Sequence, residues 1–234
     1  MAPPPGLAAG DDRTHPGDVG LVVGLAAEAR IAAPLGCRVA TGGGTAAGAE
    51  AAMRALIAQG VTGLVSFGLA GGLDPALPAG TLLVPRTLLL DGHDARQTDP
   101  ALCAWLGGAT PGPMLAGTAV VADADAKRTL HARTGAVAVD LESGAVALAA
   151  ARHGIGFAML RAVCDPADRD LPPAALAALD QAGAIGALRV LGSVLRAPGQ
   201  VPSLLRLARD AAAAQRALRE RVRLIGRGIA NKQG

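Results

Sequence analysis

One segment constrains the fold of this chain more than any other, because two apolar runs in it flank an alanine-rich stretch. The apolar runs cover residues 136–139 and 155–163, and the stretch between them, residues 143–153, favours a helix. Gly154 is suited to end that helix in the left-handed conformation. A strand, a helix and a strand in this order predict a βαβ unit, whose two strands run parallel.

Polar side chains follow both predicted strands. Asp140 and Glu142 come directly after the first strand, and Arg161 and Asp165 lie at the end of the second. The carboxyl ends of parallel strands share one edge of a sheet, and open α/β sheets bind their ligands at that edge. We therefore expect the three carboxylates and the arginine to converge on one crevice.

The alternation of apolar runs and helical stretches continues along the chain. Other runs that read as strands cover residues 19–25, 38–41, 61–67, 81–84, 88–90 and 117–122. Helices are expected at residues 26–33 and 46–59, whereas residues 98–116, rich in Pro and Gly, are expected to be irregular. This order predicts an α/β fold with a doubly wound, mostly parallel (mixed) sheet flanked by helices.

Length and composition favour one α/β domain with added ends. The chain has 234 residues, of which 51% are hydrophobic but only 1% aromatic, so the core must be built from Ala, Val and Leu. We expect a disordered tail at residues 1–17, the α/β domain at residues 18–185 and a basic helical C-terminal extension at residues 186–234.

Charge is concentrated in that extension. Residues 186–234 hold ten Arg and Lys against two acids, a net charge of +8, whereas residues 1–185 hold twelve against seventeen, a net charge of −5. Within it, residues 201–225 carry apolar side chains at helical spacing and arginines on the other faces. One interpretation is a terminal helix that packs its apolar stripe on the body or on a second subunit. The other is a surface helix that rests on anionic lipid headgroups.

The remaining composition excludes several classes of protein. The three cysteines have no paired spacing, which indicates reduced thiols in a cytoplasmic protein and neither a disulfide framework nor a metal site. The N-terminus has no basic region followed by an apolar run, so no secretory signal is predicted. No nucleic-acid-binding module is recognised, and we expect no nucleic acid partner. We expect a cytoplasmic location, at the inner face of the membrane if the extension binds lipid.

Two glycine-containing strand ends are candidates for holding an anion. Gly24 precedes a helix that carries Glu28 and Arg30, and Gly44 lies in a glycine loop before the next helix. Free backbone N–H groups point outward at such helix starts. The loop lacks the lysine of a Walker motif and the dinucleotide-binding spacing. An ordinary strand end, in which Glu28 favours the helix N-terminus, is the alternative.

Three segments of the chain carry a resemblance to a known family. They read VVGLAAEA near the start, SFGLAGGLDPALPAGTLLVP in the middle, and AVDLESGAVA with LRAVCDPAD later. Together, over roughly residues 19–170, they resemble the nucleoside phosphorylase and nucleosidase family, which includes methylthioadenosine/S-adenosylhomocysteine nucleosidase. One lineage of that family accompanies hopanoid biosynthesis and is associated with removing adenine from adenosylhopane. The chain is similar to it in GLAAEARIA, in the glycine loop and in the long C-terminal segment.

The resemblance implies cleavage of a purine N-glycosidic bond without a cofactor or metal, by hydrolysis or by phosphorolysis with inorganic phosphate as co-substrate. It implies that Asp165 protonates purine N7, that Glu142 anchors the ribose hydroxyls, and that Arg161 orients the acidic cluster or the nucleophile. Glu28 lies one residue from the water-activating Glu of the family. Further implied substrate contacts are Asp140, Leu141, Gly68, Leu69, Ala70, Val121 and Ala122, and further implied phosphate contacts are Gly24, Arg30 and Gly44.

The chain also departs from the family pattern. Cys164 stands where many relatives carry Ser, and valines occupy the region of the aromatic that stacks on adenine. An acid that protonates the base needs a raised pKa, which burial or the nearby Asp140 and Glu142 could supply. A methylthioadenosine/S-adenosylhomocysteine nucleosidase and a non-catalytic nucleoside-binding protein are alternatives. Relatives are dimers or larger rings, so a homo-oligomer is expected. Without the resemblance, Asp165 is a common turn residue, and Asp140 or Glu142 a helix cap.

Overall fold

The structure is a computed structural model that describes residues 15–43, 46–90, 94–173, 175, 199 and 201–233. Most of the expected N-terminal tail, residues 1–17, lies outside the described residues. Its last residues begin a short 3-10 helix, η1 (Pro16–Asp18). Gly44, one of the expected phosphate contacts, also lies outside the described residues.

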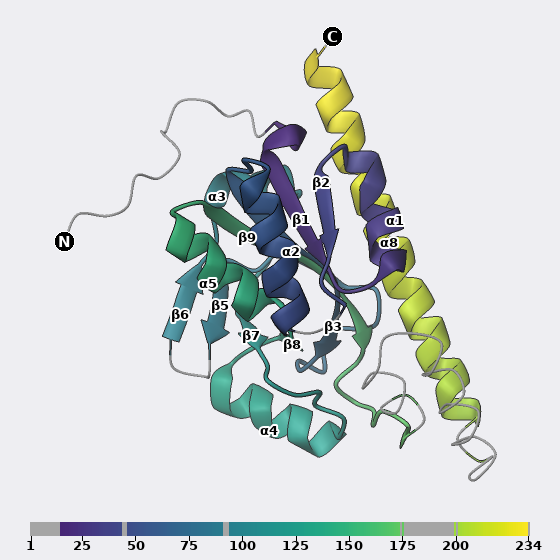
Figure 1. Ribbon diagram of the computed structural model, residues 1–234. Helices are drawn as coiled ribbons and strands as arrows, with labels where there is room; N and C mark the ends of the chain where they lie inside the picture. Colours follow the sequence, from purple (N-terminus) through teal and green to yellow (C-terminus); the bar gives the residue numbers. More distant parts are fainter. Residues whose placement is uncertain are drawn as a thin grey trace.

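A mixed β-sheet forms the middle of the molecule (Figure 1). Its strands are β1 (Val19–Val23), β2 (Arg38–Thr41), β3 (Gly63–Gly72), β4 (Leu82–Leu83), β5 (Thr87–Leu90), β6 (Asp94–Gln97), β7 (Met114–Ala116), β8 (Ala138–Asp140) and β9 (Gly156–Asp165). The order is β2-β1-β3-β8-β7-β5-β6, with β9 beside β3 and β4 beside β9. Five of the eight pairings among the described strands are parallel, which confirms a mostly parallel, mixed sheet.

Helices cover both faces of the sheet, as a doubly wound fold requires. One face carries α2 (Ala46–Ala58) and α5 (Ser143–His153), whose alanines pack with β3 and β9. The other face carries α1 (Ala26–Ala32), α3 (Pro100–Trp105) and α8 (Val201–Gln233). A further helix, α4 (Ala124–Thr134), lies below the sheet in the view of Figure 1.

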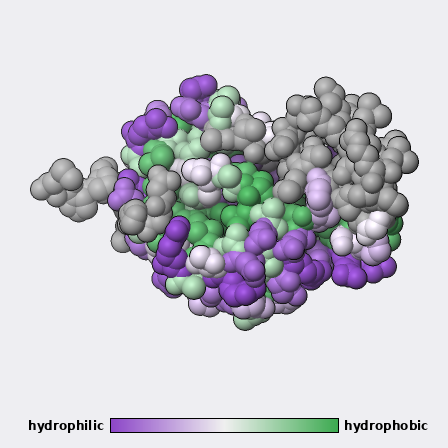
Figure 2. Space-filling model, turned by 90° about the horizontal axis from the view of Figure 1, so that it is seen from below, coloured by the Kyte–Doolittle hydropathy of each residue, from purple (hydrophilic) through white to green (hydrophobic). Residues whose placement is uncertain are grey.

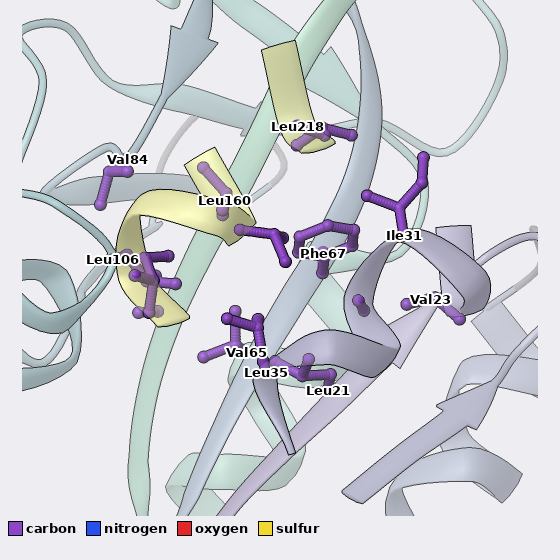
Figure 3. Close-up of a cluster of buried hydrophobic side chains, with 14 of the residues drawn as sticks. Leu21, Val23, Ile31, Leu35, Val65, Phe67, Val84, Leu106, Leu160 and Leu218 are labelled. Atoms are coloured by element: carbon purple, nitrogen blue, oxygen red, sulfur yellow. The ribbon is translucent and has the colours of Figure 1, made fainter. Parts of the chain in front are cut away.

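The long C-terminal helix α8 is part of the main core. Leu218 of α8 packs with Phe67 of β3, Leu160 of β9 and Ile31 of α1 (Figure 3). Apolar side chains recur on the same stripe of the helix, and four of them are buried: Ala214, Leu218, Val222 and Ile225. Burial of apolar surface contributes roughly 25 cal/mol per Å². The interpretation of a terminal helix packed on the body therefore describes this part of α8.

The prediction of two parallel strands in the segment from residue 136 to residue 170 is wrong, although its helix is α5 and Gly154 ends it at φ 64°. β8 does not pair with β9, because both pair with β3, β9 in the parallel and β8 in the antiparallel sense. Gly71 of β3 lies opposite Val139 on one side and Asp165 on the other. The glycine-rich end of β3 continues the strand beyond Phe67, and this extra length provides the edge on which β8 pairs.

Two further predictions around β7 are also wrong. The strand expected at residues 117–122 lies earlier, and it ends at Ala116 because its partners end there, β5 at Leu90 and β8 at Asp140. Residues 98–116 are not irregular throughout, since they contain α3 as well as β7. Asp99 caps α3, and its Oδ1 accepts backbone N–H bonds at 2.8 and 3.0 Å.

Candidate active site

Arg161 is the centre of a buried polar cluster beneath the C-terminal part of β3. Its guanidinium lies 2.5 Å from the Asp140 carboxylate and 3.1 Å from the Glu142 carboxylate. It also donates to the hydroxyl of Ser66 and, at 3.2 Å, to the carbonyl of Leu69. Burial alone would lower the pKa of Arg161, but the neighbouring carboxylates raise it, so the guanidinium stays charged.

The two acids that follow β8 have different surroundings. Asp140 Oδ2 accepts the hydroxyl of Ser143 at 2.6 Å in addition to Arg161, and Oδ1 accepts the Ser143 N–H at 3.3 Å. Both oxygens of Asp140 are therefore engaged by the protein. Glu142 is bound to Arg161 through Oε2, whereas its buried Oε1 has no hydrogen-bond partner within the described residues. An unpartnered buried carboxylate oxygen is costly in the free protein and is available to a ligand hydroxyl.

Gly24 gives Glu142 the room for this arrangement. A Cβ atom at position 24 would lie 2.5 Å from Glu142 Oε1, so a side chain there would displace the carboxylate. The close approach of the β1 end to the start of α5 thus depends on glycine.

Glu28 of α1 occupies the strand end that was expected to hold an anion. Its carboxylate accepts the backbone N–H groups of Gly24 and Leu25 at 2.9 Å each and that of Leu69 at 3.0 Å. Burial raises the pKa of Glu28, Arg161 lowers it, and the net direction is upward. A side chain at Gly68 would collide with this carboxylate. The N–H group of Gly24 is therefore engaged by the chain itself, and the side chain of Arg30 on α1 is exposed.

Asp165 lies in a second polar cluster. Its Oδ2 is 2.7 Å from the ammonium of Lys127, a residue of α4 whose side chain is 1% exposed. The same ammonium donates to the carbonyls of Pro166 at 3.1 Å and Arg169 at 2.8 Å. Burial raises the pKa of Asp165, and Lys127 lowers it without reversing that direction.

The four charged residues expected in one crevice are thus divided between two clusters. Asp140 and Glu142 form ion pairs with Arg161, which also interacts electrostatically with Glu28, while Asp165 is paired with Lys127. The direction of β8 explains this difference. Because β8 runs against β3, its C-terminal end leads back along β3 toward Gly68, which lies opposite Arg161. The like charge that raises the pKa of Asp165 comes from Asp210 and not from Asp140 or Glu142.

The other residues named by the resemblance lie along the same strand ends. Leu69 and Ala70 belong to β3, and Leu141 is a half-buried residue in the bend between β8 and α5. Val121 and Ala122 lie in the connection from β7 to α4, where Val121 packs against the apolar cluster that contains Leu115 and Val139.

A cysteine thiol also lies next to the second cluster. Burial raises the pKa of Cys164, the neighbour of Asp165, to about 12, so this thiol is not an ionised nucleophile at neutral pH. No group of three or more His, Cys, Asp or Glu side chains among the described residues is arranged to hold a metal ion.

Sequence reasoning missed Lys127, Ser66 and Ser143. Lys127 stands among charged neighbours in the polar run of residues 123–133, and that pattern favours a surface helix or loop. A weak signal was available, since Lys127 and the half-buried Leu130 are three residues apart and share one face of α4. Ser66 lies in an apolar strand, where an isolated serine is unremarkable until Arg161 is known to bind it.

The class of protein is indicated by sequence and fold together. Residues 109–197 match the phosphorylase superfamily. No curated protein matches the chain in sequence. The architecture is that of the nucleoside phosphorylase and nucleosidase fold, with the C-terminal helix described above.

Particular solved structures share this fold at low sequence identity. Futalosine hydrolase of Helicobacter pylori is 19% identical, with a TM-score of 0.58 over 76% of this chain and 97% of that chain. The 5′-methylthioadenosine/S-adenosylhomocysteine nucleosidase of the same organism is 17% identical, with a TM-score of 0.61 over 87% of this chain and 97% of that one. The corresponding nucleosidase of Colwellia psychrerythraea, in complex with adenine, is also 17% identical, with a TM-score of 0.59 over 75% and 94%.

Proposed function

We propose that this protein is an enzyme that cleaves the N-glycosidic bond of a purine nucleoside and releases adenine. The observation that carries the proposal is a pair of buried carboxyl groups, one at the end of β9 and one directly after β8, the two strands that pair with the C-terminal part of β3. Arg161 holds one oxygen of Glu142, the other has no partner among the described residues, and burial raises the pKa of Asp165. The superfamily match and the fold support the same class of reaction.

The two carboxyl groups suit the two ends of such a bond. Asp165 in its neutral form donates a proton to N7 of the base while the C1′–N9 bond breaks and its electron pair passes to the base. Glu142 accepts hydrogen bonds from the ribose hydroxyls through Oε1, and its negative charge stabilises the positive charge that develops on the sugar. In this proposal Arg161 contacts neither the base nor the ribose. It keeps the Glu142 carboxylate in position.

We infer hydrolysis in preference to phosphorolysis. In the proposed reaction the oxygen of water bonds to C1′, and the proton of that water passes to Glu28. Glu28 is suited to this because burial raises its pKa, and the negative charge of the nearby Glu142 raises the pKa of Glu28 further. A phosphate anion at this strand end would compete with the Glu28 carboxylate for the N–H groups of Gly24 and Leu25. Inorganic phosphate as co-substrate is therefore the less favoured alternative.

The finer proposal concerns the group on the 5′ side of the ribose. Leu25, next to Gly24, is 46% exposed, and Val120, in the connection after β7, is 39% exposed. Figure 2 views the molecule from the side on which α4 lies, and apolar surface gathers in the middle of that face. Such surface suits a hydrophobic substituent, as in adenosylhopane of hopanoid biosynthesis. Methylthioadenosine or S-adenosylhomocysteine as substrate, or nucleoside binding without catalysis, are the alternatives.

The oligomeric state of the protein and its contact with the membrane are also proposals. None of the helices in the described part of the chain is long and apolar enough to cross a membrane. Arginines on the outer faces of α8 are exposed, among them Arg206, Arg209, Arg216, Arg219 and Arg223. We propose a cytoplasmic homo-oligomer whose α8 can rest on the inner face of the membrane, where each basic residue contributes roughly 1 kcal/mol. Sedimentation with anionic vesicles at low and high salt tests the contact, and a mass measurement in solution tests the oligomer.

Release of adenine from a panel of nucleosides tests the main proposal. The panel contains adenosine, methylthioadenosine, S-adenosylhomocysteine and an adenosine with a long 5′ alkyl group, each with and without phosphate. We expect adenine release without phosphate, and fastest turnover with the long alkyl group. Release of adenine only in the presence of phosphate would show that the reaction is phosphorolysis and not hydrolysis. Binding of the nucleosides with no release from any of them would favour the non-catalytic alternative.

A further inference from the structure

We infer that Lys127 is a positioning residue for Asp165, which it holds together with the turn after β9 as one unit. This inference rests on the proposed function, in which Asp165 is the acid. It concerns a residue outside the sequence motifs that suggested that function.

The ammonium group of Lys127 has a hydrogen-bond acceptor for each of its three N–H donors. An ammonium group has three N–H donors, and Lys127 has three acceptors within hydrogen-bond distance: Asp165 Oδ2 at 2.7 Å and the carbonyls of Pro166 and Arg169 at 3.1 and 2.8 Å. These acceptors are the carboxylate and two backbone carbonyls of the turn that follows it. Fixing Oδ2 in this way leaves the other oxygen of Asp165 to be presented to a base.

A merely structural lysine is a weaker explanation. Burying an ammonium is unfavourable until its partners compensate for the lost hydration, and an apolar residue of similar size would fill the same space. Lys127 is 1% exposed and lies between α4 and the turn, so its charge is retained at this cost. The positive charge of Lys127 is useful because Asp165, the carboxyl group beside it, changes its ionisation during the proposed reaction.

The electrostatic surroundings of Asp165 make that use testable. Three charged groups face it: Lys127 from α4, Arg169 from its own turn and Asp210 from α8. Burial raises its pKa, Lys127 and Arg169 lower it, and Asp210 raises it. When Asp165 gives its proton to the base, a carboxylate remains next to Lys127. The adjacent ammonium stabilises that carboxylate through a charge-assisted hydrogen bond.

A pH profile separates positioning from structural support. Lys127→Met removes the cation that lowers the pKa of Asp165, so that pKa should rise. The protonated acid then persists to higher pH, and the alkaline limb of kcat/KM should move upward. Turnover at neutral pH should fall by about 10²-fold, as expected for a misplaced catalytic group. Lys127→Arg should keep the limb near its wild-type position. Arg128→Met, which changes the exposed neighbour of Lys127 on α4, should leave both quantities unchanged.

A second measurement does not depend on turnover. The titration of Asp165 is followed by carbon NMR of labelled aspartate carboxyl groups, with Asp165→Asn to identify its signal. A higher titration midpoint in Lys127→Met than in wild type supports the inference, and equal midpoints overturn it. If Lys127→Met fails to fold in thermal denaturation, Lys127→Gln replaces it, because the amide still donates to the two carbonyls. A wild-type protein that releases no base would refute the proposed function, while the NMR comparison would still decide whether Lys127 controls Asp165.

Discussion

The guanidinium of Arg161 lies 2.5 Å from the carboxylate of Asp140, and both side chains are buried. Glu142 contacts the same guanidinium nitrogen at 3.1 Å, and Glu28 interacts with the guanidinium electrostatically, so one cation compensates three carboxylates. The cluster therefore depends on Arg161 for its stability as well as for its geometry.

Arg161→Met should destabilise the fold strongly. The substitution leaves buried carboxylates without their cation, and breaking a buried pair in this way costs about 3–5 kcal/mol. Urea denaturation of the variant and of wild type measures the loss. Arg30→Met on exposed α1 surface is the matched control and should lie within about 0.5 kcal/mol of wild type. A loss for Arg161→Met no larger than that of the control would mean that the cluster is not held by its charge.

Glu142→Gln should weaken the hydrogen bonds between the enzyme and the ribose hydroxyls of the substrate. The amide presents at most one acceptor oxygen and no negative charge, so turnover of a ribonucleoside should fall by about 10²-fold. The wild-type enzyme should also discriminate against 2′- and 3′-deoxyribose substrates, and the variant should lose much of that discrimination. Kinetics on the matched substrates decide the matter, and undiminished discrimination would remove Glu142 from the ribose site.

Asp165→Asn should abolish base release and leave the fold intact. The carboxamide keeps the size of the side chain but has no acidic proton for N7, and the loss of a general acid costs about 10²- to 10⁴-fold. Asp168→Asn changes an exposed acid in the same turn and should retain activity. Circular dichroism confirms folding of both variants. Turnover near the wild-type rate for Asp165→Asn would exclude the proposed acid.

Leu218→Ala should show whether α8 is a structural element. Leu218 is fully buried against β3 and β9, and truncation of a buried leucine costs about 2–5 kcal/mol. Leu205→Ala, on the same helix at a side chain that is 54% exposed, should cost less than about 0.5 kcal/mol. Thermal denaturation compares the two. Equal and small effects would mean that α8 contributes little to the fold.

The cysteines should resist alkylation in the folded protein. Burial raises the pKa of Cys37 and Cys164 to about 12. At pH 8 a thiol with that pKa is ionised in only about one molecule in 10⁴, and the thiolate is the reactive form. Iodoacetamide followed by mass spectrometry should therefore label neither residue before urea is added and both afterwards. Rapid labelling of Cys164 at pH 8 without urea would contradict this prediction.

Much of the architecture is predictable because it depends on local patterns. The alanine-rich composition of residues 143–153, with Gly154 at their end, predicts α5. The apolar runs predict the strands of a sheet that helices cover on both faces. The spacing of apolar residues on α8 likewise predicts one buried stripe. These features follow from side-chain size and backbone preference within a few residues.

The sequence by itself determined which residue types stand at the strand ends, including Asp140, Glu142, Arg161 and Asp165. Only the tertiary structure decided how they are grouped, since the direction of β8 brings two of these acids to Arg161 and leaves Asp165 with Lys127. A run of three apolar residues favours a strand whichever way it points. Its direction, and the burial of a lysine from a helix with a polar sequence, are set by contacts between segments far apart in the chain, which local preference does not encode.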